Sequence, residues 1–175
     1  YRINNKYIKI MEGFIMKKIT ALLLMAVMSL TLLTGCLSDP VYDDFENFLN
    51  VEMSEVNANY VKITEEAAKW AEFEEDAELA TSVKDVLLPL VDDSLEKLAN
   101  INPETEEIKE LKAKYVKVMD AYKEGFTMIF EALEAQDADK MNEGNAKLED
   151  GIALLDEYNA ALEAKAEELG AEIEY

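Results

Sequence analysis

Clustered carboxylates are the most abundant groups in this sequence that could do chemistry. They occur at Glu74-Glu75-Asp76-Glu78, at Asp92-Asp93 and at Glu167-Glu168. Two carboxylates facing each other across a cleft can hydrolyse a glycosidic bond, one as the acid and the other as base or nucleophile. These clusters, however, fall opposite the apolar positions of their own segments, which is typical of a solvated helix face. We therefore expect no catalytic residues here and no enzyme.

Other reactive groups and metal ligands are scarce. The chain has no histidine and one cysteine, so zinc sites and Cys/His nucleophile pairs are excluded. The segment "DADKMNEG" (residues 137–144) has the acidic spacing of a calcium loop, but Met141 and Asn142 occupy the third-ligand and glycine places. Leu148 stands where the bidentate glutamate belongs. We expect neither a dedicated metal site nor a cofactor, and diffuse binding of divalent cations to the acidic surface is the alternative left open.

The single cysteine, Cys36, follows a segment with the three-part layout of a secretory signal peptide. Met16-Lys17-Lys18 gives a positive start, and an apolar stretch from Ile19 to Leu33 follows. That stretch is shorter than the roughly 20 residues that a transmembrane helix needs. The pattern favours a leader that is removed after export.

The quartet Leu33-Thr34-Gly35-Cys36 resembles the lipobox of bacterial lipoprotein precursors, which reads apolar residue, small residue, Gly or Ala, then Cys. The resemblance implies that signal peptidase recognises Leu33, Thr34 and Gly35. It also implies that Cys36 carries the lipid and becomes the first mature residue. The expected location is the extracytoplasmic face of the bacterial cell membrane, with the lipid as anchor.

The chain divides into five expected segments. Residues 1–15 precede the apparent start at Met16 and are interpreted as upstream sequence wrongly joined to the gene. Residues 16–35 are the lipoprotein signal peptide, and residues 36–40 are a short lipid tether. Residues 41–170 are expected to form one acidic helical domain, followed by a C-terminal tail at 171–175.

The charge balance excludes several classes of partner. Without residues 1–35 the chain loses five basic groups and one acidic group, so that 12 lysines and 37 carboxylates remain, a net charge of −25. Such a surface disfavours nucleic acid and other polyanions. The expected partners are the membrane, through lipidated Cys36, and cell-wall material or an envelope protein.

Apolar periodicity predicts an all-α fold. The first helix has apolar residues every seven positions from Tyr42 to Ala77. A second segment has a start signal at Thr81-Ser82 and Asp85, and Pro89 inside it predicts a kink or two short helices. Asn102 and Pro103 are expected to begin the third helix, and Asp137 to Asp139 the fourth, which Gly170 ends.

Short connections between long amphipathic helices favour an up-and-down bundle of four helices. Three long helices, with the second segment absorbed into a neighbour, are the alternative. Gly125, Gly144 and Gly151 fall inside the third and fourth helices, where each costs about 1 kcal/mol relative to alanine. They predict either close helix packing or a notch for a ligand or partner side chain, and packing is favoured.

The acidic, alanine- and glutamate-rich pattern "ALEAQDADKMNEGNAKLEDG" is similar to small uncharacterised helical lipoproteins of low-GC Gram-positive bacteria, including the family described as cell-wall-binding lipoproteins. The similarity implies an extracytoplasmic role in the cell envelope and carries over no residues beyond the lipobox. The first hypothesis is therefore a binding or structural module. The alternative is a small-ligand carrier or sensor with an apolar pocket between helices, suggested by Trp70, Tyr115, Tyr122 and Tyr158.

Overall fold

A computed structural model describes residues 29–31 and 39–174. Helices make up nearly all of residues 40–169, which confirms the predicted all-α class. The first helical stretch consists of α3 (Pro40–Asn47), the π-helix η1 (Phe48–Glu52), α4 (Ser54–Ala68) and the 3-10 helix η2 (Lys69–Glu72). The second consists of α5 (Asp76–Ser82), the π-helix η3 (Val83–Leu87) and α6 (Leu88–Asn100). Two uninterrupted helices follow, α7 (Glu106–Ala135) and α8 (Ala138–Leu169).

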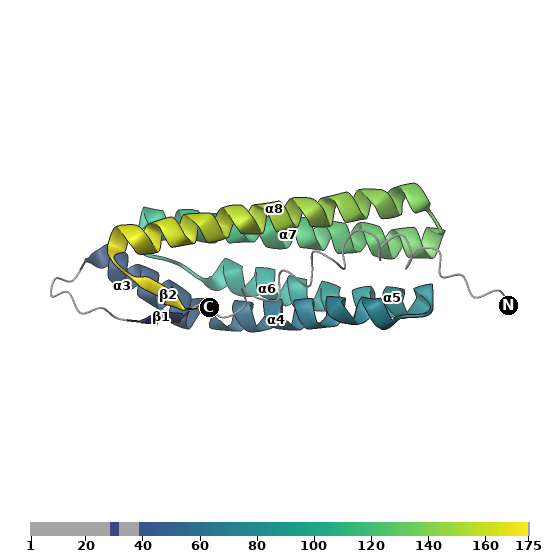
Figure 1. The fold of residues 1–175 in the computed structure, drawn as a ribbon, viewed down its shortest axis with the longest axis horizontal. Coiled ribbons are helices and arrows are strands. Elements are labelled where there is room, and N and C mark those ends of the chain that lie inside the picture. Colours follow the sequence, from purple (N-terminus) through teal and green to yellow (C-terminus); the bar gives the residue numbers. More distant parts are fainter. Residues whose placement is uncertain (1–28, 32–38, 175) are drawn as a thin grey trace.

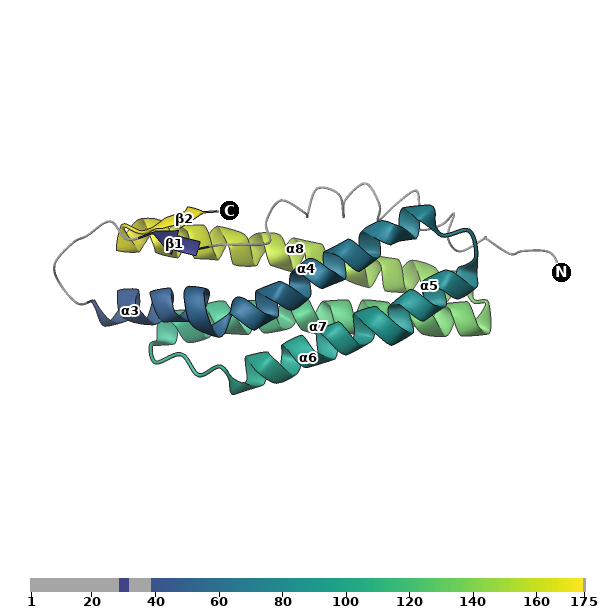
Figure 2. The ribbon, with the colours of Figure 1, turned by 90° about the horizontal axis from the view of Figure 1, so that it is seen from below.

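The helices form an elongated molecule with two layers. In Figure 1, α7 and α8 lie side by side above, and the stretches containing α4 and α6 lie below. The helix α4 packs against α6, and α6 packs against α7. Figure 2 shows α3 and α5 near opposite ends of the long axis. At 1.5 Å per residue, the 32 residues of α8 span about 48 Å.

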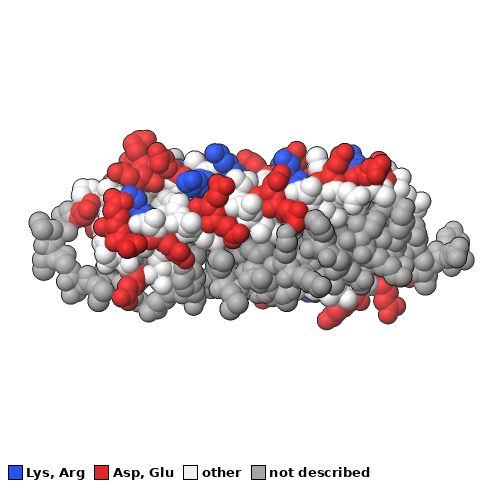
Figure 3. All heavy atoms as spheres, turned by 45° about the horizontal axis from the view of Figure 1, so that its top comes forward, with Lys and Arg blue, Asp and Glu red and all other residues white. Residues whose placement is uncertain are grey.

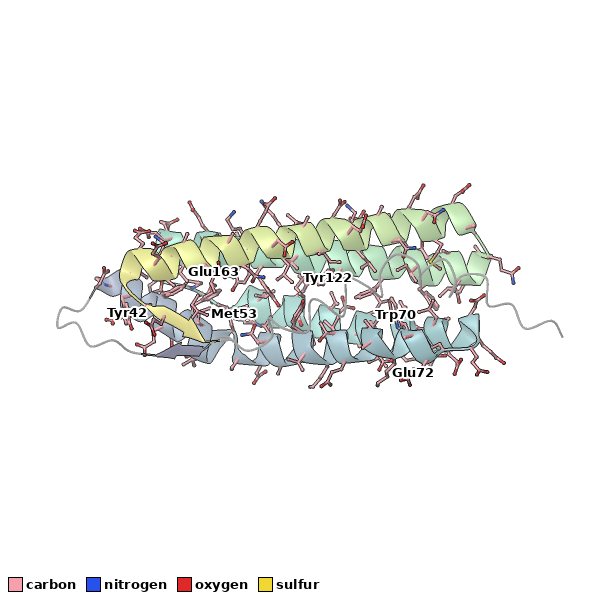
Figure 4. The ribbon with its side chains drawn as sticks, viewed as in Figure 1. Tyr42, Met53, Trp70, Glu72, Tyr122 and Glu163 are labelled. Atoms are coloured by element: carbon pink, nitrogen blue, oxygen red, sulfur yellow. The ribbon has the colours of Figure 1, made fainter. Side chains whose placement is uncertain are left out.

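The core runs along the whole interface between the layers. Near the α3 end it contains Phe45, Phe48 and Met53, all fully buried. Farther along it contains Trp70, which is 2% exposed and packs edge-on against Phe126 with ring centroids 6.1 Å apart. The labelled side chains of Met53, Trp70 and Tyr122 point into this interior in Figure 4, whereas Glu72 lies on the outside.

The surface is mixed but predominantly acidic. Figure 3 shows carboxylates interspersed with fewer lysines along the visible face of the molecule. Many lysines pair with these carboxylates within the described chain, including Lys69 with Glu66 and Lys147 with Glu124 at N–O distances of 2.6 and 2.9 Å. Such exposed pairs contribute little to stability individually.

Two predicted helix ends agree with the structure. Asp137 caps α8, because its carboxylate accepts hydrogen bonds from the N–H groups of Asp139 and Lys140, both at 3.0 Å. Gly170 ends the same helix in the left-handed conformation with φ of 67°, which glycine adopts without a steric penalty.

Two predicted helix starts are wrong. The second helical stretch begins at Asp76 and not at Thr81-Ser82, because Glu78 accepts hydrogen bonds from the N–H groups of Glu74 and Glu75 at 2.8 and 3.0 Å. The first helical stretch accordingly stops at Glu72, and Ala77 belongs to α5.

The third helix begins at Glu106, and Pro103 lies in the preceding loop. Asp44, on α3, accepts hydrogen bonds from the N–H groups of Glu104 and Thr105 at 3.1 and 2.8 Å. This contact between distant segments fixes Thr105 as the residue before the helix, whereas Asn102 instead donates to the Asn100 carbonyl.

A small strand pair was not predicted. The strand β1 (Ser29–Thr31) pairs antiparallel with β2 (Glu172–Glu174), with Leu30 opposite Ile173. The expected C-terminal tail therefore contains a strand. Because β1 falls within the expected signal peptide, cleavage before Cys36 would remove one partner of this pair.

Candidate functional site

An open cleft of about 420 Å³ lies between α5, η3 and the C-terminal part of α7. Its lining combines one lysine, three carboxylates, a threonine and an apolar wall: Asp76, Ala77, Ala80, Thr81, Lys84, Asp85, Phe130, Leu133 and Glu134. The volume falls in the range of small-molecule sites, roughly 300–1,000 Å³. Mixed charge beside an apolar wall makes this cleft the candidate binding site.

The short helix α5 forms one wall because its start is held firmly. The Glu78 carboxylate satisfies two N–H groups that precede the helix, those of Glu74 and Glu75. Leu79 on the opposite face of α5 is 1% exposed and packs into the core. Burial of Leu79 turns Ala77, Ala80 and Thr81 toward the cleft side.

The π-helix η3 places two charged residues in the lining, Lys84 and Asp85. Its wider turn is closed by a hydrogen bond from the Leu88 N–H to the Val83 carbonyl, five residues earlier. Pro89 follows immediately, and a proline in a regular helix would clash with the carbonyl four residues before it, here that of Asp85. The π-turn is the form that the expected kink takes, and such turns occur frequently at functional sites.

The lysine of the cleft is held by an aromatic ring. The Lys84 ammonium lies 5.3 Å from the centroid of the Phe130 ring, a cation–π contact worth about 0.5–1 kcal/mol at an exposed site. Within the described part of the chain, no carboxylate lies within ion-pair distance of this ammonium. The charge of Lys84 is therefore available to an incoming anionic group.

A buried hydrogen-bond chain lies at the end of α5 that joins η3. The Trp70 Nε1–H donates to the Ser82 hydroxyl at 2.9 Å, and Ser82 in turn hydrogen-bonds Glu66. Burial by itself raises the pKa of Glu66, but hydrogen bonds from Lys69 and Ser82 outweigh it and lower that pKa overall. This chain ties α5 to the first helical stretch and holds the cleft wall in place.

The glycines predicted as a notch or packing site lie between α7 and α8, away from the cleft. A Cβ at Gly151 would stand 2.5 Å from Tyr122 Cε1, and one at Gly144 would stand 2.9 Å from Ile129 Cγ1. A Cβ at Gly125 would meet Leu148 Cδ2 at 2.6 Å. Neighbouring side chains already fill the space beside all three glycines, which let the two helices approach closely.

The aromatic residues suggested for an apolar pocket are packed against core neighbours. Tyr115 and Tyr158 contact each other edge-on with ring centroids 4.9 Å apart, and both are at most 5% exposed. Burial raises the pKa of Tyr60 to about 12 and raises the pKa values of Tyr115, Tyr122 and Tyr158 as well. These phenols stay protonated at neutral pH and act as core side chains.

The remaining predicted site residues, Leu33, Thr34, Gly35 and Cys36, lie outside the described residues. Of the carboxylate clusters, Glu74-Glu75-Asp76-Glu78 contributes Asp76 to the cleft. Sequence reasoning missed Lys84 and Phe130. They are 46 residues apart, and the only local signal near them was Pro89.

Comparisons with protein families, with curated proteins and with solved structures gave no match to this chain. The described residues hold no group of three or more histidine, cysteine, aspartate or glutamate side chains arranged to bind a metal ion. None of the helices described here has the length and apolar character needed to cross a membrane.

Proposed function

We propose that this protein is a lipid-anchored module of the bacterial cell envelope. It is exported by residues 16–35, held at the extracytoplasmic face of the membrane by lipidated Cys36, and contacts cell-wall material or another envelope protein through its helical domain. The lipobox resemblance at residues 33–36 supports the anchor. The absence of histidine, and of any cysteine beyond Cys36, supports a binding or structural role over an enzymatic one.

One structural observation carries the proposal. The helical domain begins at Pro40, only four residues after Cys36. The helix α3 lies at one end of the long axis and α5 lies near the other (Figure 1). Residues of α5 line the cleft. Residues 37–40 can span roughly 14 Å when extended. An anchor at Cys36 would therefore hold one end of the molecule at the bilayer and leave the cleft end free to meet its partner.

We also propose that the domain is best classed as an up-and-down four-helix bundle. Four helical stretches, residues 40–72, 76–100, 106–135 and 138–169, are separated by short non-helical connections. The separation of 76–100 from both neighbours supports four stretches over the alternative of three long helices. The π-turns are local widenings inside the first and second stretches.

Replacement of the cysteine tests the anchor. Cys36→Ala should release the protein from membranes or leave an unprocessed precursor, because two acyl chains on this residue would supply stable retention. Gly35→Ala is the matched control, since the lipobox pattern accepts either residue before the cysteine. Fractionation and intact mass measure both outcomes, and normal processing with full membrane retention of Cys36→Ala would refute the anchor.

A small-ligand carrier or sensor is the second candidate. The cleft between α5, η3 and α7 favours it more than the packed aromatic residues do, because the cleft is open and has polar groups beside an apolar wall. Native mass spectrometry of protein extracted from its own membranes distinguishes the two candidates. A bound small molecule would support the carrier, and a wall fragment or protein partner would support the module.

A further inference from the structure

The charged residues that line the cleft between α5, η3 and α7 indicate which charges a ligand should carry. Lys84 is its single cationic residue, and Asp76, Asp85 and Glu134 are its carboxylates. Seven of the eleven other lysines of the described chain pair with carboxylates, namely Lys69, Lys97, Lys109, Lys123, Lys140, Lys147 and Lys165. In so acidic a chain, a lysine that faces a cleft over an aromatic ring is a suitable partner for a ligand carboxylate.

The carboxylates of the same cleft suit the opposite charge. Asp85 lies beside Lys84 on η3, and Glu134 comes from α7 across the cleft; both side chains are exposed. A ligand ammonium group would gain attraction from them without displacing a buried ion pair. A ligand with only an anionic group would meet net repulsion, because Asp85 and Glu134 together outweigh the one lysine. The cleft therefore fits a molecule that carries both charges.

The apolar lining adds a third requirement. Phe130 and Leu133 on α7 are half-buried, and Ala77 and Ala80 face them from α5. When an aliphatic group of the ligand covers this wall, the complex is stabilised by roughly 25 cal/mol per Å² of apolar surface removed from water. A bare zwitterion without an aliphatic side chain would leave this wall exposed.

We propose that the cleft binds a small zwitterion with an aliphatic side chain, an amino acid or a short peptide of the leucine type. The ligand carboxylate pairs with Lys84, its ammonium group lies between Asp85 and Glu134, and its side chain covers Phe130 and Leu133. This inference rests on the proposed binding role of the domain but not on the anchor at Cys36. Lys84 and Asp85 both lie in the π-turn and both line the cleft.

The test is isothermal titration calorimetry on the full chain with four probes: leucine, leucyl-leucine, N-acetyl-leucine and leucinamide. Saturable binding of leucine or of the dipeptide is expected, with both blocked probes at least about ten-fold weaker. Tighter leucine binding identifies a free amino acid as the ligand, and tighter dipeptide binding identifies the end of a peptide.

Two variants assign the charges. Lys84→Met should weaken leucine and N-acetyl-leucine about ten-fold and leave leucinamide unchanged, because only the first two have a carboxylate. Glu134→Gln should weaken leucine and leucinamide and leave N-acetyl-leucine unchanged. Lys147→Met, on α8, is the matched control and should alter none of them, and circular dichroism checks that every variant is folded.

Absence of saturable binding of leucine and leucyl-leucine up to about 10 mM would overturn the inference. Binding that Lys84→Met leaves intact would overturn it too, since the charge of Lys84 carries the argument. Neither result bears on the membrane retention that Cys36 is proposed to give. Conversely, a Cys36→Ala chain that stays on the membrane would leave the cleft chemistry unaffected.

Discussion

Asp44 on α3 holds Thr105 at the start of α7, although 61 residues separate them in the chain. The Thr105 N–H and hydroxyl donate to Asp44 Oδ2 at 2.8 and 2.6 Å, and the Glu104 N–H donates to Oδ1 at 3.1 Å. Thr105 itself makes no side-chain hydrogen bond that caps the helix. The carboxylate of another helix therefore holds the N-cap residue of α7 and the residue before it, and so fixes where the chain enters the helix.

Replacement of Asp44 should destabilise the fold. Asp44→Ala leaves three donors without their acceptor at a site where the aspartate is 7% exposed, so we expect a loss of about 2 kcal/mol in the free energy of unfolding. Urea denaturation followed by circular dichroism measures it. Asp43→Asn, exposed on the same helix, is the control and should change stability by less than about 0.5 kcal/mol. An equal effect of the two variants would refute the role of Asp44 in holding the start of α7.

The pH dependence of stability should reflect opposite shifts at two neighbouring carboxyl groups. Burial raises the pKa of Asp44, but hydrogen bonds from Thr105 and Glu104 outweigh it and bring that pKa below 3.8. The stabilising contribution of ionised Asp44 is complete at pH values above the pKa that this group has in the unfolded chain. It is lost as the pH falls through the lower pKa of the folded state. Glu52 behaves in the opposite way, because burial and then the charge of Asp44 raise its pKa above 4.5, against a smaller opposing effect of Lys112.

Glu52→Gln should therefore stabilise the protein at neutral pH. In the folded state the raised pKa means that the ionised form is disfavoured, so stability falls as pH rises from 4.5 through the folded pKa. We expect a gain on the order of 1 kcal/mol at pH 7 that disappears below the unfolded pKa. Urea midpoints across this pH range measure it, with exposed Glu65→Gln as control. A gain that persists in acid would contradict the ionisation argument.

Gly151→Ala should destabilise the protein even though alanine is the better helix former. The new Cβ would stand 2.5 and 2.6 Å from two atoms of the Tyr122 ring, which cannot bend aside. We expect the steric cost of overpacking to exceed the propensity gain of about 1 kcal/mol, for a net loss of about 1–2 kcal/mol. Ala153→Gly, exposed on the same helix, isolates the propensity effect. Thermal melts that showed Gly151→Ala to be stabilising would refute close packing at this point.

Ser82→Ala should loosen the contact between α5 and the first helical stretch. Trp70 would lose its hydrogen-bond acceptor while remaining 2% exposed, at a cost of about 1–2 kcal/mol. Because Trp70 is the only tryptophan in the chain, unfolding followed by its fluorescence reports on this site directly. Ser54→Ala, at an exposed position, is the control. If both variants unfolded at the same urea concentration, the Trp70–Ser82 bond would contribute nothing.

Local signals allowed correct predictions wherever the structure depends on neighbours in sequence. Asp137 and Gly170 bound α8 as expected, since an N-cap acts within three residues and a left-handed glycine acts alone. The start of α7 was mispredicted because Asp44, which fixes it, lies on another helix. The prediction at Pro89 identified an interruption but could not specify a π-turn.

The cleft could not be predicted for the same physical reason. Lys84 and Phe130 come together only through the packing of η3 against α7, and neither residue has an unusual neighbour in sequence. The glycines at 125, 144 and 151 did indicate a special environment, because each is costly inside a helix. Their contact with Leu148, Ile129 and Tyr122 then depends on the register of α7 against α8.

The π-turn at Val83–Leu87 also determines how this stretch would respond to a deletion. A π-turn contains about one residue more than a regular turn, so removing one residue from 84–87 would restore an uninterrupted α-helix through this region. The Leu88 N–H would then donate to the same Val83 carbonyl, now four residues earlier, and the residues after the deletion would keep their orientation relative to α5. Buried Val91 and Leu98 would therefore stay in the core. The change would fall on the turn that carries Lys84 and Asp85, so a deletion here would alter the lining of the cleft and leave the core as it is.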